Sequence, residues 1–286
     1  DLLKGGRITR MLRPARMFHI LTVDPNRGST AKEGYVGLTE TNIWLHTLPD
    51  ATSTEQAVKI IRHYQVWDEL PEEIRNYLLN MKPEQDTLKK PEFEEMDCRI
   101  YGVVPDHLGV LPVSLALARE LGYTPYVINK ANFLDAAEAG KFVANMARLI
   151  VAEHSPFAAP CALFMTGEKV VAVGKSKGIG GRNQEFCVSA ANVIAGQDRI
   201  VITSVDTDGT DGPGGLFDQK ARDQGVVALA GGVVDGATKE SAAKLGYDLA
   251  DILKSHDASK PLWDINDGVW TSPSISVQDL SVCLIR

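Results

Sequence analysis

The chain has 286 residues, which suggests about two domains, and its 30 Lys and Arg against 37 Asp and Glu give a net charge of −7. A composition that is 44% hydrophobic and 23% charged excludes a disordered chain, a collagen-like fibre and a small disulfide-rich scaffold. The acidic balance also argues against broad electrostatic binding to nucleic acid, so any anion site must be local.

The four cysteines stand far apart, and none belongs to a CxxC pair or a run of Cys and His ligands. We therefore expect buried free thiols in a reducing compartment. The sequence contains neither an apolar run of the ~18 residues that a membrane span needs nor an apolar signal segment, so a cytoplasmic protein without a membrane partner is expected. The chain does not begin with Met, and we expect a processed chain or a piece of a longer one.

In the first half of the chain, apolar runs of strand length alternate with segments of helical spacing. This alternation is typical of a mostly parallel sheet. The predicted elements are a buried strand at 17–23, helices that begin near Ser53 and Pro71, a polar surface loop at 81–96, a strand at 98–104, a helix at 110–121, a strand at 124–128 and a long amphipathic helix at 134–153.

A shift of composition near residues 155–157 predicts a boundary between a domain of residues 1–157 and one of residues 158–286. The elements predicted after it are short strands at 161–165 and 170–173, a glycine-rich loop, a helix at about 183–195, a strand at 200–205, an acidic glycine loop and a final strand at 280–285.

The glycine-rich loop at residues 174–181 leads directly into a predicted helix. Its four glycines allow the backbone to approach a ligand closely, and unpaired N–H groups at a helix N-terminus suit phosphate or carboxylate. Lys175, Lys177 and Arg182 add local positive charge. The loop has neither a Walker A ending nor a full GxGxxG pattern, so a flexible, solvated loop with a basic tip stays an open alternative.

The acidic loop follows the predicted strand at 200–205, at the end of a strand where open α/β sheets place ligand sites. Asp206, Asp208 and Asp211 repel one another unless a cation or hydrogen-bond donors neutralise them. The spacing does not fit a calcium loop, and magnesium completed by phosphate fits better, with an exposed Asp-Gly turn as the alternative. The six histidines are scattered, and no Gly-x-Ser-x-Gly elbow supports nucleophilic catalysis.

The motifs Gly-Gly-Arg-Asn-Gln-Glu at 180–185 and Asp-Gly-Thr-Asp-Gly-Pro at 208–213 together resemble the glycerate 2-kinase family with the MOFRL domain. Some members of this family were once labelled hydroxypyruvate reductases. Weaker similarity at residues 4–7, 121–123 and 277–280 extends the resemblance over nearly all of the chain. It implies an α/β fold: a mostly parallel, Rossmann-like sheet domain, incomplete at its N-terminus, followed by a C-terminal α/β MOFRL-like domain.

The resemblance implies transfer of the γ-phosphate of ATP to the 2-hydroxyl of D-glycerate or a related small hydroxy acid, with magnesium, in a cleft between domains. Arg182 would be the catalytic cation. The implied nucleotide- or substrate-binding residues are Glu168, Gly178, Gly180, Gly181, Asn183 and Glu185, and the implied metal ligands are Asp206, Asp208 and Asp211.

Departures from the family pattern leave a second interpretation open. The family's catalytic lysine would lie before Asp1, in a missing segment or a separate chain, and the loops at 24–28 and 271–276 differ from those of the family. The chain could therefore be a diverged, non-catalytic subunit or binding module that works with a separate chain. A homo-oligomer is also left open, whereas a dehydrogenase has no dinucleotide fingerprint to support it.

Overall fold

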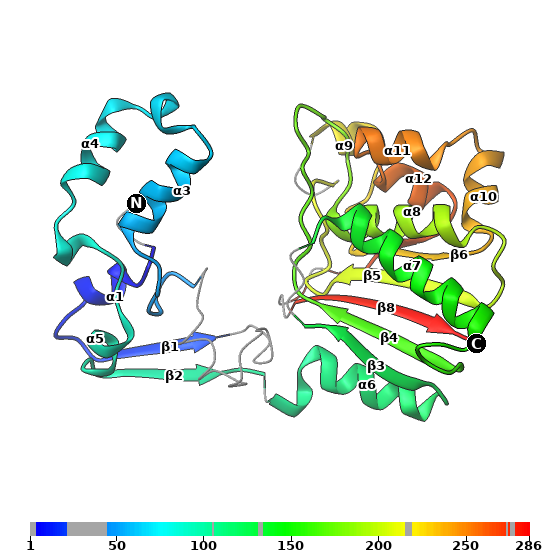
Figure 1. The fold of residues 1–286 in the computed structure, drawn as a ribbon, viewed down its shortest axis with the longest axis horizontal. Coiled ribbons are helices and arrows are strands. Elements are labelled where there is room, and N and C mark those ends of the chain that lie inside the picture. Colours follow the sequence, from blue (N-terminus) through cyan, green and yellow to red (C-terminus); the bar gives the residue numbers. More distant parts are fainter. Residues whose placement is uncertain are drawn as a thin grey trace. The chain divides into compact units, whose positions relative to one another are not determined.

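The structure is a computed structural model, and it describes residues 4–21, 45–104, 106–130, 134–214, 219–272, 274 and 278–286 (Figure 1). These residues form two compact units, an N-terminal unit up to Val103 and a C-terminal unit from Val104 onward. The loop at 24–28 and the end of the predicted strand at 22–23 lie outside the described residues, as does most of the segment 273–277.

The N-terminal unit contains a two-stranded parallel sheet, in which β1 pairs with β2 from Met17 opposite Cys98 to Leu21 opposite Gly102. Ser53 caps α3 in a capping box with Gln56, as the sequence predicts. The elements of this unit are α1 (Arg7–Met11), β1 (Met17–Leu21), α3 (Thr54–His63), η1 (Trp67–Glu69), α4 (Glu72–Asn80), η2 (Pro83–Gln85), α5 (Lys90–Glu94) and β2 (Cys98–Gly102).

The segment 81–96, predicted as a polar surface loop, contains two short helices, η2 and α5. Both of these short helices have proline in their first turn. Proline is tolerated there because the N–H that it lacks would have no partner inside the helix.

The C-terminal unit is built on a six-stranded sheet of order β3-β4-β8-β5-β6-β7, in which only β3 and β4 are parallel neighbours. The α/β class predicted from the sequence is confirmed. The elements are η3 (Asp106–Leu108), α6 (Val110–Glu120), β3 (Thr124–Asn129), α7 (Ala136–Glu153), β4 (Cys161–Thr166), α8 (Arg182–Ile194), β5 (Ile200–Asp206), α9 (Gln219–Asp223), β6 (Gly231–Asp235), α10 (Thr238–Lys244), α11 (Leu249–Ser255), α12 (Ser259–Asp264), β7 (Gly268–Val269) and β8 (Asp279–Ile285).

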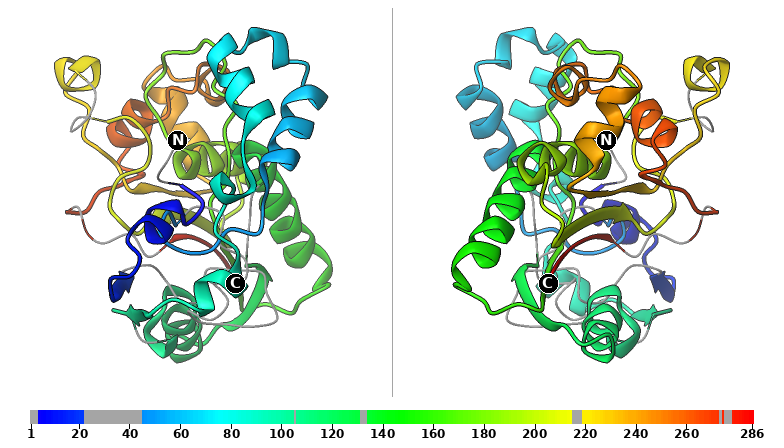
Figure 2. Two further views of the ribbon diagram at one scale, coloured as in Figure 1. Left: turned by 90° about the vertical axis from the view of Figure 1, so that its left-hand side faces the viewer. Right: turned by 90° about the vertical axis from the view of Figure 1, so that its right-hand side faces the viewer.

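The sheet of the C-terminal unit is covered by helices on both faces (Figure 1, Figure 2). All six residues of β4 are buried, and they divide between the two faces because successive strand residues point in opposite directions. Leu163 and Met165 pack in the main core with α7 and α8, whereas Phe164 packs against α6. This layering fixes the start of α8 beside the ends of the central strands.

The predicted strand at 170–173 is not formed. Only Val170 makes an isolated bridge, to Asp135, and residues 171–173 have no regular structure. The physical reason is that β4 already pairs with β3 on one side and β8 on the other, so it offers no free edge to a following hairpin strand.

The predicted domain boundary at residue 157 remains a prediction. The two compact units divide near residue 103, and β3, which precedes the predicted boundary, pairs with β4, which follows it.

All four cysteines are free, as the sequence predicts, and Cys161, Cys187 and Cys283 are buried. Burial raises the pKa of the Cys187 thiol to about 12, which leaves it protonated and unreactive near neutral pH. Within the described ranges, no helix combines the length and the apolar character that crossing a bilayer requires.

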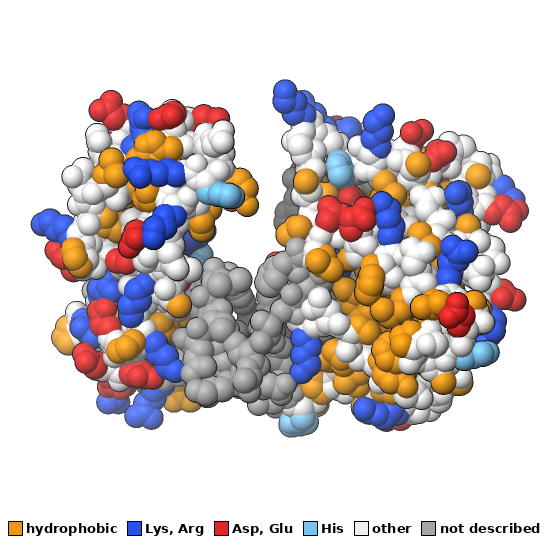
Figure 3. All heavy atoms as spheres, in the orientation of Figure 1, with side chains coloured by type: hydrophobic (Ala, Val, Ile, Leu, Met, Phe, Trp, Pro, Cys, Tyr) orange, Lys and Arg blue, Asp and Glu red, His pale blue; other side chains and the backbone are white. Residues whose placement is uncertain are grey.

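Hydrophobic side chains gather on the surface of the C-terminal unit where α6, β3 and α7 lie (Figure 3). Large apolar side chains of α6 and α7, among them Val113, Leu117, Phe142 and Leu149, are exposed. An apolar surface of this kind commonly marks a region that contacts another polypeptide.

Gly140 tests the close packing of α7 on α8. A Cβ at this position would lie 2.3 Å from the Phe186 carbonyl oxygen. Helix propensity alone favours Ala over Gly by about 1 kcal/mol, yet we expect Gly140→Ala to lower the free energy of unfolding by roughly 2 kcal/mol or more, because a backbone atom cannot move aside. Urea unfolding measures the change, with Asn145→Ala on the exposed face of α7 as the control. A stabilised Gly140→Ala variant would show that the two helices are not in close contact.

Candidate functional site

The two predicted loops meet at one end of the sheet. Asp206 ends β5, Asp279 begins β8, and the two are opposite each other in the antiparallel pairing of these strands. Arg182 begins α8 directly after the glycine-rich loop. Residues distant in sequence therefore converge because the ends of β5 and β8 lie together at the N-terminus of α8.

Arg182 forms a fork with two buried carboxylates. Its Nε and Nη2 donate to the two carboxylate oxygens of Asp279 at 2.6 and 2.7 Å, and Nη2 also donates to Asp206 at 2.7 Å. Burial lowers the pKa of Arg182, but the hydrogen bond to Asp279 and the nearby negative charges more than offset this and raise it. The guanidinium therefore stays charged, while its side chain remains 26% exposed.

Asp211 caps the N-terminus of α8 from a distant part of the chain. Its carboxylate accepts the backbone N–H groups of Asn183 and Gln184 at 2.9–3.1 Å, together with both of their side-chain amides. Gly181, the N-cap residue, has no side chain that could do this. The N–H groups that the sequence suggested for a phosphate are thus bonded to a carboxylate of the chain itself.

Asp206 and Asp208 are held separately from Asp211. Burial raises the pKa of Asp206 to about 7, the charge of Asp279 adds to the rise, and the Asp208 N–H and Arg182 oppose it. Asp208 accepts both the N–H and the hydroxyl of Thr210 within its own turn. Across the part of the chain that the structure describes, no group of three or more His, Cys, Asp or Glu side chains is placed to hold a metal ion.

Lys169 and Asp279 complete the cluster, and sequence reasoning missed both as site residues. Lys169 is 3% exposed, donates to Ser281 Oγ at 3.0 Å, and has its Nζ 4.0 Å from Asp279. Burial lowers the pKa of this lysine, against the raising effect of Asp279 and Asp211. Nothing in the sequence indicates that a lysine after an apolar strand turns inward, whereas an acid at the first residue of a strand is a detectable signal.

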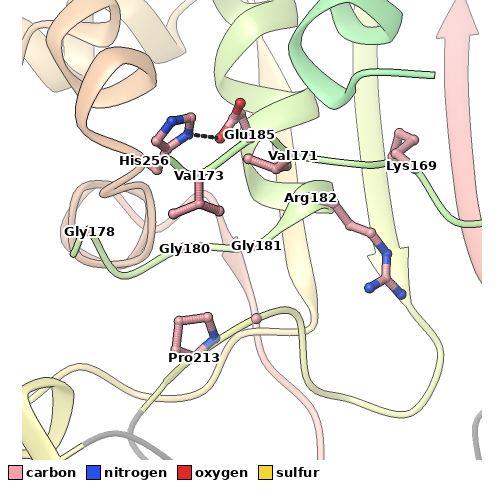
Figure 4. A pocket seen from close by; sticks show the side chains of 11 residues that line it. Lys169, Val171, Val173, Gly178, Gly180, Gly181, Arg182, Glu185, Pro213 and His256 are labelled. Carbon is pink, nitrogen blue, oxygen red and sulfur yellow. Dashed lines mark hydrogen bonds and ion pairs between the residues drawn. The ribbon is translucent and has the colours of Figure 1, made fainter. Parts of the chain in front are cut away.

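A pocket of about 260 Å³ lies beside this cluster (Figure 4). Five of the residues that line this pocket were predicted as site residues from the sequence. Two titratable residues in the lining, Lys169 and His256, were not predicted. The lining residues are Lys169, Val171, Val173, Gly178, Gly180, Gly181, Arg182, Glu185, Gly212, Pro213 and His256.

Five predicted site residues are not part of the lining: three of them are buried in the network, and Asp208 and Glu168 are half-buried. Asn183, Asp206 and Asp211 are the buried ones, each bonded within the network. Glu168 is half-buried in the connection after β4.

Two glycines of the loop are required by its packing. A Cβ on Gly178 would lie 2.1 Å from the Ser255 carbonyl oxygen, and one on Gly181 would lie 2.2 Å from the Asp211 carbonyl oxygen. The loop is further held by the Ile179 N–H, which donates to Asp257, and by its own carbonyl at Ile179, which accepts from the Ser259 N–H. Gly178 and Gly181 are therefore required by close packing, whereas a Cβ at Gly174 would meet no atom within 4 Å, so the alternative of a solvated loop stays open for the basic tip at 174–177.

The segment 161–277 matches the model of the MOFRL family. A D-glycerate 2-kinase of Thermotoga maritima is 30% identical over 285 residues, which are 99% of this chain and 60% of that protein. A glycerate 2-kinase of Pyrococcus horikoshii is 26% identical over 95% of this chain and 56% of its own length. The chain thus spans about three fifths of the length of these curated relatives.

Two solved structures resemble the whole chain. The crystal structure of a glycerate kinase from Thermotoga maritima has a TM-score of 0.67 and 29% identity, over 100% of this chain and 61% of that one. A crystal structure of a protein from Pyrococcus horikoshii has a TM-score of 0.61 and 25% identity, over 99% of this chain and 59% of that one.

The raised pKa of Asp206 predicts a pH effect on stability. A folded-state pKa of about 7, above the ordinary value near 4, means that the folded state binds this proton more tightly, so the stabilisation is complete at low pH and is lost as pH rises through 7. The unfolding free energy of wild type minus that of Asp206→Asn should therefore fall by roughly 2–4 kcal/mol between pH 4 and pH 8. Urea unfolding of both proteins at each pH measures it, and a constant difference would contradict the assignment.

The second prediction of this site concerns Arg182. Arg182→Ala removes the guanidinium that donates to Asp206 and to Asp279, which is 1% exposed and would keep only the Asn183 amide and, at 4.0 Å, Lys169 as partners. Unpaired buried charge is costly, so we expect a loss of about 3–5 kcal/mol in unfolding free energy at pH 8. Arg148→Ala, on the exposed side of α7, is the matched control and should change stability by less than about 0.5 kcal/mol. Equal stability of the two variants would mean that Arg182 serves a ligand and not the fold.

Proposed function

We propose that the chain is a member of the glycerate 2-kinase family and that it takes part in the ATP-dependent phosphorylation of D-glycerate or a related small hydroxy acid. The glycerate kinase names belong to relatives that are longer than this chain. The activity, the nucleotide and the hydroxy acid are therefore proposals for this protein, supported by the chemistry of the pocket.

Arg182 is the observation that carries the proposal. Phosphoryl transfer depends on positioning and on neutralisation of negative charge more than on covalent chemistry. Two nitrogens of Arg182 are fixed by Asp279 and Asp206, while Nη1 has no hydrogen-bond partner among the described residues, and the side chain lines the pocket. A guanidinium held in this way presents a fixed positive charge to a phosphate or a carboxylate without the cost of ordering it first.

The neighbouring residues would shape the site around that charge. Gly178, Gly180 and Gly181 place bare backbone on the pocket wall, where a phosphate chain or a small acid could lie close to it. Asn183 acts indirectly, since it binds Asp211 and Asp279 and so holds the start of α8. Lys169 also lines the pocket, although its side chain is only 1% exposed.

Magnesium fits this site poorly as an ion held by the three aspartates. Asp211 is occupied by the N-terminus of α8, Asp206 is paired with Arg182, and Asp208 is bonded within its turn. Magnesium in proteins is often held by one or two carboxylates together with substrate phosphates. We therefore keep magnesium in the proposal only as the ion that accompanies ATP.

The active enzyme that we propose includes more polypeptide than these 286 residues, because the chain matches about three fifths of the length of its kinase relatives. One fixed guanidinium rarely supplies all the charge neutralisation that phosphoryl transfer needs. The remainder would come from more of the same polypeptide or from a separate chain.

A coupled assay of ADP formation tests the proposal, with D-glycerate, ATP and magnesium. We expect little turnover from the 286 residues alone. Clear turnover is expected when a polypeptide that corresponds to the remaining two fifths of the relatives is added. Arg182→Lys keeps the charge but loses the fork, so it should lower kcat/KM by about 100-fold or more, while Arg148→Ala leaves it unchanged. Turnover by the completed enzyme that Arg182→Lys leaves unchanged would remove Arg182 from the mechanism.

The second candidate is a non-catalytic subunit or binding module of the same fold that works with a separate chain. It is favoured by the internal ion pairs that engage Arg182 and by the exposed apolar surface of α6 and α7. Absence of turnover with every small hydroxy acid, even in the completed protein, would support this candidate over the kinase.

A further inference from the structure

His256 and Glu185 form a pair on the wall of the pocket (Figure 4). The Nδ1 atom of His256 lies 2.8 Å from Oε2 of Glu185. Glu185 lies in the first turn of α8 and is 8% exposed, whereas the histidine side chain is 22% exposed. The carboxylate is thus fixed below the surface, while the imidazole remains accessible.

The backbone holds His256 firmly. It is the C-cap residue of α11, in the left-handed region with φ 54°, and its N–H is bonded within the helix end. Gly178 and Gly180 pack against its carbonyl group, so that no side chain could be accommodated at Gly178 without displacing it. The ring position is therefore set by α11, by the loop and by Glu185 together.

The contact with Glu185 also sets the tautomer of a neutral ring. An ionised carboxylate only accepts hydrogen bonds, so Nδ1 must carry the proton and Nε2 must be the acceptor. Nε2 has no hydrogen-bond partner among the described residues. The charged groups that share the pocket with the pair are the cations Arg182 and Lys169. Figure 4 shows the imidazole and the Arg182 guanidinium on different sides of this pocket, so an oriented proton acceptor and a fixed cation would meet a ligand at separate points.

We propose that His256, oriented by Glu185, is the general base of the phosphoryl transfer, a role that rests on the proposed kinase function. The hydroxyl oxygen of the small hydroxy acid forms a bond to the γ-phosphorus of ATP, and the bond from that phosphorus to the bridging oxygen breaks, with its electron pair leaving on ADP. The hydroxyl proton passes to Nε2 of His256, which later releases it to water. Glu185 stabilises the imidazolium that forms.

His154 provides a matched control for this proposal. It is the C-cap residue of α7, with the same φ of 54°, and its side chain is exposed. Asparagine tolerates this backbone conformation, so His256→Asn and His154→Asn should both fold with little change in melting temperature. In the preparation that turns over ATP, we expect His256→Asn to lower kcat by about 100-fold or more with little change in KM for ATP, and His154→Asn to leave both constants unchanged.

Two further readouts separate a base from a structural role. The kcat of wild type should depend on pH in a way that the kcat of His256→Asn does not, because a general base accepts the hydroxyl proton only in its unprotonated form. In NMR spectra of ¹⁵N-histidine-labelled wild-type protein, His256 should show the Nδ1–H tautomer, and Glu185→Gln should weaken that preference. An active wild type whose kcat and pH profile are unchanged by His256→Asn, or an Nε2–H tautomer, overturns this proposal alone. A completed wild type without turnover overturns the proposed function as well.

Discussion

Buried charge at the N-terminus of α8 is the constraint on which the rest of the C-terminal unit depends. Asp279, Asp211 and Lys169 are almost fully buried, with Asp206 and Arg182 at their border. Charges in such surroundings are strongly destabilising unless each is paired and hydrogen-bonded. Arg182 satisfies two of the carboxylates, and the helix N-terminus satisfies Asp211. The start of α8, the end of β5 and the start of β8 therefore cannot move independently.

This constraint explains the form of the two loops. The acidic loop must turn so that Asp211 reaches the N–H groups of α8, and the backbones then approach so closely that Gly181 and Gly212 admit no side chain. The preceding glycine-rich segment is fixed in turn against the residues around His256. A pocket wall of bare backbone results, rigid because it is packed on both sides. Fixed dipoles and charges of this kind act on a ligand without reorganising first.

The same cluster explains the roles that are proposed for the individual side chains of the site. Asp206 holds Arg182 and Asp211 caps α8, and a guanidinium and an imidazole line the pocket. The pocket lining combines the side chains of Arg182 and Lys169 with the carboxylate of Glu185, in a chain whose net charge is −7.

The sequence by itself determined the α/β class, most strands and long helices, and the two motifs that meet at the site, because apolar periodicity and glycine- or acid-rich loops are local properties. It could not decide the strand proposed at 170–173, since only the tertiary structure shows that both edges of β4 are occupied. It also could not tell which partner each charge would find. Asp211 meets a helix start 28 residues earlier in the chain, and Arg182 meets Asp279 97 residues later. Lys169 and His256 became candidates only because the fold turned one inward and set the other beside Glu185. Pairings of this kind follow from sheet order and helix packing, which no local pattern encodes.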